Sequence, residues 1–241
     1  VPQPAREAAG EGSAVAQYWQ DLRAGLRYVL GWRALLILMV MATLINLVLS
    51  PATSFLPLLV KEHFQGTAWH LGAMEAALGI GVIVGGALLG LWGGFRNRIV
   101  TSLVGLVGLG LSVILTGLTP AALFPVAVFA SAMLGLMMSF ANGPLMAVLQ
   151  ANVDPAMQGR VFTLLSSAAT AMMPLGLAVA GPVADTIGVR LCFLLGGGIT
   201  LLIGLGGFMM PSLLNIEQER ASHQAVARPG LAASPSTEPL A

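Results

Sequence analysis

A tract of 55 residues, from Ile99 to Val153, contains no charged side chain. At about 1.5 Å of rise per residue, one helix of that length would be far longer than a bilayer is thick. The tract must therefore fold back on itself. Thr119-Pro120 is its one obvious break. A tract of this kind predicts at least two membrane-spanning helices.

Composition supports a membrane protein: 56% of the residues are apolar and only 9% are charged, against about 25% charged in ordinary soluble domains. The net charge of +1 gives no general case for nucleic-acid binding. The single cysteine, Cys192, excludes an internal disulfide and a cysteine-built metal site. The three histidines lack metal-ligand spacing. We expect no metal, no organic cofactor and no enzymatic reaction.

Hydropathy and the positions of the charged residues predict an all-α, polytopic helical bundle with six transmembrane helices. The expected spans are residues 34–60, 71–95, 99–118, 122–149, 161–184 and 191–214. Within the first span, Pro51 removes a backbone donor and should bend the helix.

The regions outside the bundle (residues 34–214) have different compositions. Residues 1–17 are expected to be a flexible linker, and the absence of an initiator Met suggests a chain cut from a longer one. Residues 18–33 carry apolar side chains at three- and four-residue steps, which predicts an amphipathic helix lying along the membrane surface. Residues 215–241 are expected to be a disordered cytoplasmic tail.

The basic residues predict the orientation. Six spans place both termini on one side, and nine of the 11 Lys and Arg residues fall on that side. The two on the other side are Lys61 and Arg190. The positive-inside rule then puts both termini in the cytoplasm, with the protein integral to the plasma membrane, which in bacteria is the inner membrane.

Two turns share a pattern that indicates an internal repeat. The first reads Gly90-x-x-x-Gly94 and continues to Arg96 and Arg98. The second reads Gly181-x-x-x-Asp185-x-x-Gly188-x-Arg190. The turns correspond if spans one to three repeat as spans four to six, and a three-span unit makes the copies inverted. Inverted repeats are typical of secondary transporters. With 30 glycines in the chain, a chance match is the alternative.

Glycine spacing on the second span predicts a helix–helix contact. Gly86 and Gly90 lie four residues apart, as do Gly81 and Gly85. This spacing lets another backbone come close in lipid. We expect Gly86 and Gly90 to form such a contact.

Several sequence motifs together resemble the drug-efflux branch of the major facilitator superfamily that contains macrolide-efflux proteins and the enterobactin exporter. They are Trp92-Gly-Gly-Phe-Arg-Asn-Arg98, Gln158-Gly-Arg-Val-Phe162, Met173-Pro-Leu-Gly and Ala180-Gly-Pro-Val-Ala-Asp185-x-Ile-Gly188. The resemblance covers residues 18–214 and implies the C-terminal six-helix half of a twelve-span transporter. The superfamily's cytoplasmic signature has an acid where this chain has Gly94, and Asp185 restores the acid in the later copy.

The resemblance implies that the first and fourth spans line a central cavity, which makes Asn46, Asn142 and Met138 candidate substrate contacts. The asparagines could instead tie helices together, and Met138 could simply pack. Glu75 is a candidate proton-coupling group or an interfacial carboxylate. The expected function is proton-coupled efflux of small amphiphilic drugs or siderophore-like compounds, with a missing N-terminal half or a second copy as partner. The alternatives are a half-length subunit with a structural role and no transport alone, and an intramembrane enzyme.

Overall fold

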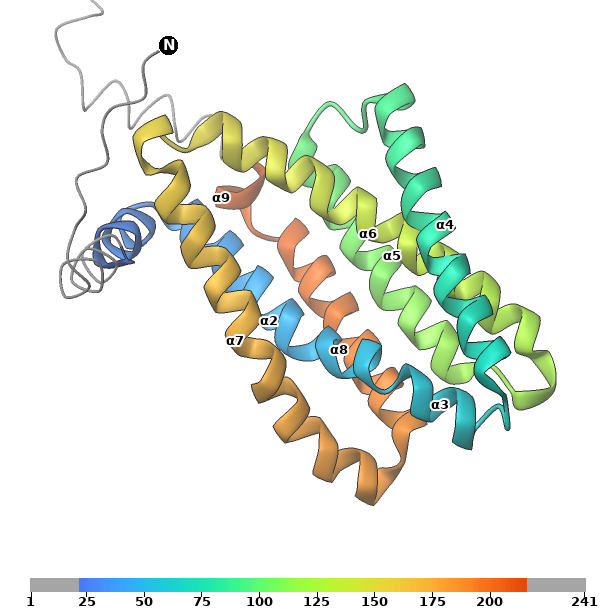
Figure 1. Cartoon of the computed structure of the whole chain (residues 1–241). Coiled ribbons are helices and arrows are strands. Elements are labelled where there is room, and N and C mark those ends of the chain that lie inside the picture. The colour runs from blue at the N-terminus through green and yellow to red at the C-terminus, as the bar shows by residue number, and fades with distance from the viewer. Residues whose placement is uncertain (1–21, 216–241) are drawn as a thin grey trace, which may run out of the picture.

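The computed structural model describes residues 22–215, and every regular element within this range is helical (Figure 1). Six helical segments are long and apolar enough to cross a membrane. They are Arg33–Glu62, Ala68–Trp92, Arg98–Leu118, Ala121–Asn152, Pro155–Ile187 and Val189–Phe208. The prediction of a six-span helical bundle is confirmed. The predicted linker (1–17) and all but the first residue of the predicted tail (215–241) lie outside the described residues.

The individual elements follow the chain order. The first span comprises α2 (Arg33–Ser54) and α3 (Leu56–Glu62), which are separated at Phe55. The remaining elements are α4 (Ala68–Trp92), α5 (Arg98–Leu118), η1 (Ala121–Leu123), α6 (Phe124–Asn152), α7 (Pro155–Ile187), α8 (Val189–Phe208) and α9 (Pro211–Leu214). Pro51 lies inside α2, and its carbonyl accepts a hydrogen bond from the backbone N–H of Phe55 at 2.8 Å, where that helix ends.

Capping residues place the second span three residues earlier than predicted. The backbone N–H of Thr67 donates to Nδ1 of His70 at 3.1 Å, which closes a capping box at the start of α4. At the other end, Gly93 adopts φ 77°, a left-handed conformation that favours glycine and ends the helix.

The fifth span begins six residues earlier than predicted, because Pro155 starts the helix instead of breaking the chain. The side chain of Asp154 accepts a hydrogen bond from the backbone N–H of Ala156 at 2.9 Å and caps α7. A proline in the first helical position loses no hydrogen bond, since that N–H has no partner within the helix.

The packing of the helices confirms the inverted repeat. α4 packs along α6, and α7 packs along α2. Likewise α5 packs along both α6 and α8, and α2 packs along α8. Exchanging the first three spans with the last three interchanges α4–α6 with α2–α7 and α5–α6 with α2–α8, and it leaves α5–α8 unchanged. The basic residues Arg33, Arg98 and Arg160 mark one end of the bundle, called here the arginine end. Lys61 and Arg190 mark the opposite end.

Glycine contacts bring α4 and α6 close together. They involve Gly81 of α4 and Gly135 of α6, and not the predicted Gly86 and Gly90. A Cβ on Gly81 would overlap the Ala132 carbonyl of α6, and a Cβ on Gly135 would overlap the Leu78 carbonyl of α4. Gly86 and Gly90 face open space among the described residues, so the predicted contact is wrong for this bundle. Sequence spacing alone could not distinguish Gly81 and Gly85 from Gly86 and Gly90, because each pair places two glycines on one face of the helix.

We therefore predict that Gly81→Ala destabilises the bundle and that Gly86→Ala does not. The added methyl group at Gly81 must push α6 away, and such overpacking costs about 1–3 kcal/mol. Thermal unfolding of the two purified variants is the measurement. Equal melting temperatures for Gly81→Ala and the unmodified protein would show that α4 and α6 are not in close contact.

Candidate functional site

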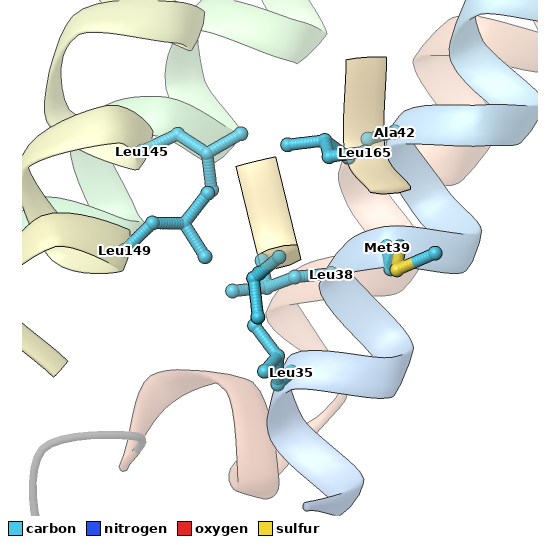
Figure 2. Close-up of a pocket in the computed structure, with 8 residues that line it drawn as sticks. Leu35, Leu38, Met39, Ala42, Leu145, Leu149 and Leu165 are labelled. Carbon is cyan, nitrogen blue, oxygen red and sulfur yellow. The ribbon is translucent and has the colours of Figure 1, made fainter. Parts of the chain in front are cut away.

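A narrow apolar crevice lies near the arginine end, where α2, α6 and α7 meet (Figure 2). Its enclosed space is only about 10 Å³, and the surrounding volume reaches about 270 Å³ when the open space at its mouth is counted. The lining side chains are all apolar: Leu35, Leu38, Met39 and Ala42 from α2, Leu145 and Leu149 from α6, and Val161 and Leu165 from α7. Such a wall suits the apolar part of a ligand and offers it no charge.

The helix over residues 22–30 packs beside this crevice at the arginine end. Val29 is fully buried and belongs to the same apolar cluster as Leu35 and Val161 of the crevice. The hydroxyl of Tyr28 accepts a hydrogen bond from the backbone N–H of Asp154 at 3.3 Å. The described part of the predicted surface helix is thus held by the turn between α6 and α7.

Asn46 and Asn142 each lie about one helical turn from the crevice, on α2 and α6. The Asn46 amide donates to the carbonyl of the crevice residue Ala42 at 2.8 Å. Asn142 comes three residues before the lining residue Leu145 and donates to the Met138 carbonyl at 3.0 Å. Each bond stays within its own helix, so neither asparagine ties two described helices together.

Both asparagines and Met138 are exposed in this bundle. Each amide oxygen has no hydrogen-bond partner among residues 22–215. An amide of this kind can offer one donor and one acceptor to a ligand or to water. The three residues can therefore supply polar and polarisable contacts beside an apolar wall.

Glu75 lies apart from these residues. It is exposed, seven residues into α4 and near the opposite end of the bundle. α4 packs mainly on α6, whereas the crevice lies between α6, α2 and α7. The structure therefore does not bring Glu75 together with the two asparagines.

Hydrogen bonds and two glycines shape the turn at residues 93–98. Gly93 and Gly94 both adopt φ 77°, so glycine suits the place where the superfamily signature has an acid. The backbone N–H of Phe95 donates to the hydroxyl of Thr101 at 2.9 Å. A Cβ on Gly94 would come within 2.9 Å of the same hydroxyl oxygen.

The basic residues of this turn are free for other contacts. Arg96 and Arg98 form no ion pair within residues 22–215. A Cβ on Gly90, earlier in the same motif, would meet no atom within 4 Å among the described residues. The turn thus presents two guanidinium groups and an open glycine face.

In the corresponding turn between α7 and α8, Arg190 has a clear structural partner. Its Nε donates to the Gly117 carbonyl at 2.7 Å, and its Nη2 donates to the Leu118 carbonyl at 3.2 Å. A cation at the C-terminal carbonyls of α5 stabilises that helix. Gly188 adopts φ 87° and ends α7.

The acid of this second turn has no such partner. Asp185 is exposed and makes no ion pair within the described range. Gly181, four residues earlier, likewise faces open space there. Arg190 is therefore the motif residue whose contacts hold together the end of the bundle opposite the arginine end.

Comparison with known proteins identifies the family. The model of the transmembrane secretion effector family, a branch of the major facilitator superfamily, matches residues 5–238. The chain belongs to the transmembrane secretion effector family. Macrolide efflux protein A of Streptococcus pyogenes is 32% identical over 186 residues, which are 77% of this chain and 46% of that protein.

Two other relatives in the comparison are named as an efflux pump and as a transporter. The multidrug efflux pump Tap of Mycolicibacterium fortuitum is 29% identical over 61% of this chain and 36% of its own length. The uncharacterized transporter YfiS of Bacillus subtilis is 30% identical over 77% of this chain and 45% of its own length. The chain spans about half the length of these relatives or less. No solved structure matches.

Sequence reasoning missed the residues that line the crevice of this family member. Leu35 and Leu149 lie in helices that are apolar on nearly every side, so periodicity does not single them out. One signal could have located the three crevice helices. Prolines lie inside α2, α6 and α7, but α4, α5 and α8 contain none.

Proposed function

We propose that this chain is one six-helix half of a secondary transporter that exports small amphiphilic compounds by alternating access. The observation that carries the proposal is the apolar crevice between α2, α6 and α7, with Asn46 and Asn142 one turn away from it. An amphiphilic drug or siderophore-like compound needs this combination of a large apolar wall and a few polar anchors.

The other wall of the site would come from a second six-helix bundle. The relatives are about twice as long as the matched region, which supports a preceding half in the same protein. A second copy of this chain is the other possible source. Rocking of the two bundles around a site between them would expose it to each side of the membrane in turn.

We propose proton exchange as the driving force, with Glu75 as the coupling group. Among the acids of residues 22–215, Glu75 lies deepest inside a span, since Glu62, Asp154 and Asp185 are at or beside helix ends. Intramembrane acids commonly serve as proton relays.

The coupling role predicts that Glu75→Gln abolishes efflux driven by a proton gradient but leaves substrate binding intact. Glutamine keeps the shape of the side chain and cannot release a proton. Glu62→Gln, which changes an exposed acid at the end of α3, is the matched control. Drug efflux from vesicles with an imposed pH gradient is the measurement. Normal efflux by Glu75→Gln would assign this residue an interfacial role instead.

The binding role predicts that Asn46→Leu lowers resistance to some drugs more than to others and leaves the melting temperature unchanged. The amide hydrogen-bonds only within its own helix, so its removal should weaken substrate contacts without loosening α2 from its neighbours. Losing one uncharged hydrogen bond to substrate corresponds to roughly 0.5–1.5 kcal/mol, or about a twofold to tenfold change.

The control for this prediction is Asn152→Leu, which removes a buried amide that donates to the Val148 carbonyl at 2.8 Å. This change should lower stability and affect every drug alike. Resistance profiles and melting curves are measured for both variants in the intact gene. An unaltered resistance profile for Asn46→Leu would contradict the binding role. An unmodified gene that confers no resistance at all would instead indicate a half-length structural subunit.

The proposed orientation places the arginine end and both termini in the cytoplasm. A cysteine at Arg98 should then react with a membrane-impermeant maleimide only from the cytoplasmic side, and a cysteine at Lys61 only from outside. Cys192 is replaced first to remove background labelling. If both positions react from the same side, the six-span topology is wrong.

A further inference from the structure

The helix over residues 22–30 turns away from α2 at the arginine end of the bundle. Gly31 and Trp32 separate the two helices, and Trp32 adopts an extended conformation with φ −127° and ψ 103°. The chain therefore changes direction at this point (Figure 1). Three residue steps reach about 11 Å at most, so Leu30 lies within that distance of Arg33, where the first span begins. This connection keeps the helix at the level where the bundle leaves the membrane.

One side of the 22–30 helix packs on the bundle. A Cβ on Gly25 would come within 3.3 Å of the Arg160 carbonyl oxygen of α7, and the Val29 side chain is fully buried. The hydroxyl of Tyr28 accepts the backbone N–H of Asp154 at 3.3 Å. These contacts fix the rotation of the helix about its own axis, and so they determine which of its side chains stay uncovered.

Two leucines and two arginines lie on the sides of this helix that the bundle leaves uncovered. Leu26 and Leu30 are 42% and 57% exposed, and Arg23 and Arg27 are exposed as well. At about 100° per residue, the leucines lie about 100–140° round the helix from Gly25, and the arginines lie about 160–200° from it. An apolar edge and a basic edge thus lie side by side. The four residues are called here the leucine–arginine edge.

The arginines of this edge have no acid to pair with among the described residues. Arg23 and Arg27, and also Arg33 at the start of α2, form no ion pair within residues 22–215. Asp154 is the one acid that this range places at the arginine end, and its side chain accepts the backbone N–H of Ala156 at 2.9 Å. The described part of this end therefore has an excess of positive charge, which attracts an anionic partner.

The arrangement of the four side chains favours a lipid as that partner. A helix at a membrane surface places its apolar side chains among the upper acyl chains and its arginines at the level of the headgroups. Leu26 and Leu30 suit the first environment, and a guanidinium group binds phosphate oxygens through two parallel N–H donors. An acidic protein segment would pair with the arginines and leave the two leucines against water.

We propose that the leucine–arginine edge binds anionic phospholipid, with Leu26 and Leu30 among the acyl chains and with Arg23 and Arg27 on the phosphate group. Arg33 adds a third guanidinium group at the start of α2. The proposal does not rest on the efflux function, because it follows from the uncovered side chains of the 22–30 helix and their place at the end of the first span.

Quenching of a fluorescent label by brominated lipids tests the proposal. Leu26→Cys is introduced into the full protein after Cys192→Ala, labelled with bimane and reconstituted into vesicles of phosphatidylglycerol and phosphatidylcholine. In each sample only one of the two lipids carries bromine on its acyl chains, so the quenching reports which lipid lies beside the label. Varying the fraction of phosphatidylglycerol then gives the relative affinity of the edge for the two lipids.

The label should show a preference for phosphatidylglycerol of roughly 25-fold, because each arginine near an anionic surface contributes about fivefold. The preference should weaken at about 1 M salt, where the Debye length falls to about 3 Å.

Two double variants locate the binding. Arg23→Gln with Arg27→Gln should remove the preference for phosphatidylglycerol. Arg96→Gln with Arg98→Gln takes the same charge from another exposed position at the arginine end and should leave the preference unchanged. All four arginines are exposed, so both variants should fold, and the melting temperature of each is compared with that of the labelled parent.

Three results would each overturn the proposal. Absence of quenching by either lipid would show that water or another protein segment covers the edge. Equal quenching by both lipids would place the helix at the bilayer without a site for an anionic headgroup. An equal loss of preference in the two double variants would show a general attraction to the positive end of the bundle. None of these measurements involves transport, so their outcome is independent of the proposed efflux function.

Discussion

The rest of the structure depends on the close approach of helix backbones at glycines. Lipid tails are as apolar as leucine, so helices in a membrane associate through packing and hydrogen bonds, and not through the hydrophobic effect. Gly81 and Gly135 bring α4 onto α6, and Gly110 and Gly197 bring α5 onto α8. In the last case each glycine lies against the other's carbonyl, so even one methyl group would have to force the backbones apart. These contacts fix which helices are neighbours.

The position of the crevice follows from where such contacts are absent. α4, α6, α5 and α8 pack side by side in that order, and α2 joins α8 to α7. α6 and α7 meet at few points, and the apolar gap between them is bounded by α2 (Figure 2). The crevice is therefore a consequence of the inverted repeat. It lies where α2, the first helix of one copy, approaches α6, the first helix of the other.

The sequence predicts the number and order of spans well, because its charged residues, such as Arg96 and Asp154, lie mostly at the ends of apolar segments. It predicts helix boundaries less well, since a capping box at Thr67 and a proline at the first position of α7 move the ends by several residues. The sequence does not predict which glycine pair of α4 contacts α6. It also does not predict which residues line the crevice. A leucine in the crevice and a leucine facing lipid belong to the same kind of helix, and only the packing distinguishes them.

The helices of this bundle divide into two kinds by how their backbone hydrogen bonds are satisfied. α4, α5 and α8 contain no internal proline, and the end of α5 is held at three successive carbonyls. Arg190 donates to those of Gly117 and Leu118, and His63 bonds to that of Thr119 at 2.8 Å. The helices α2, α6 and α7 contain prolines that leave carbonyls without their usual donor. Among the six long helices, carbonyls freed by an internal proline thus occur only in α2, α6 and α7, which surround the crevice. The proline-free helices α4, α5 and α8 pack against these three helices.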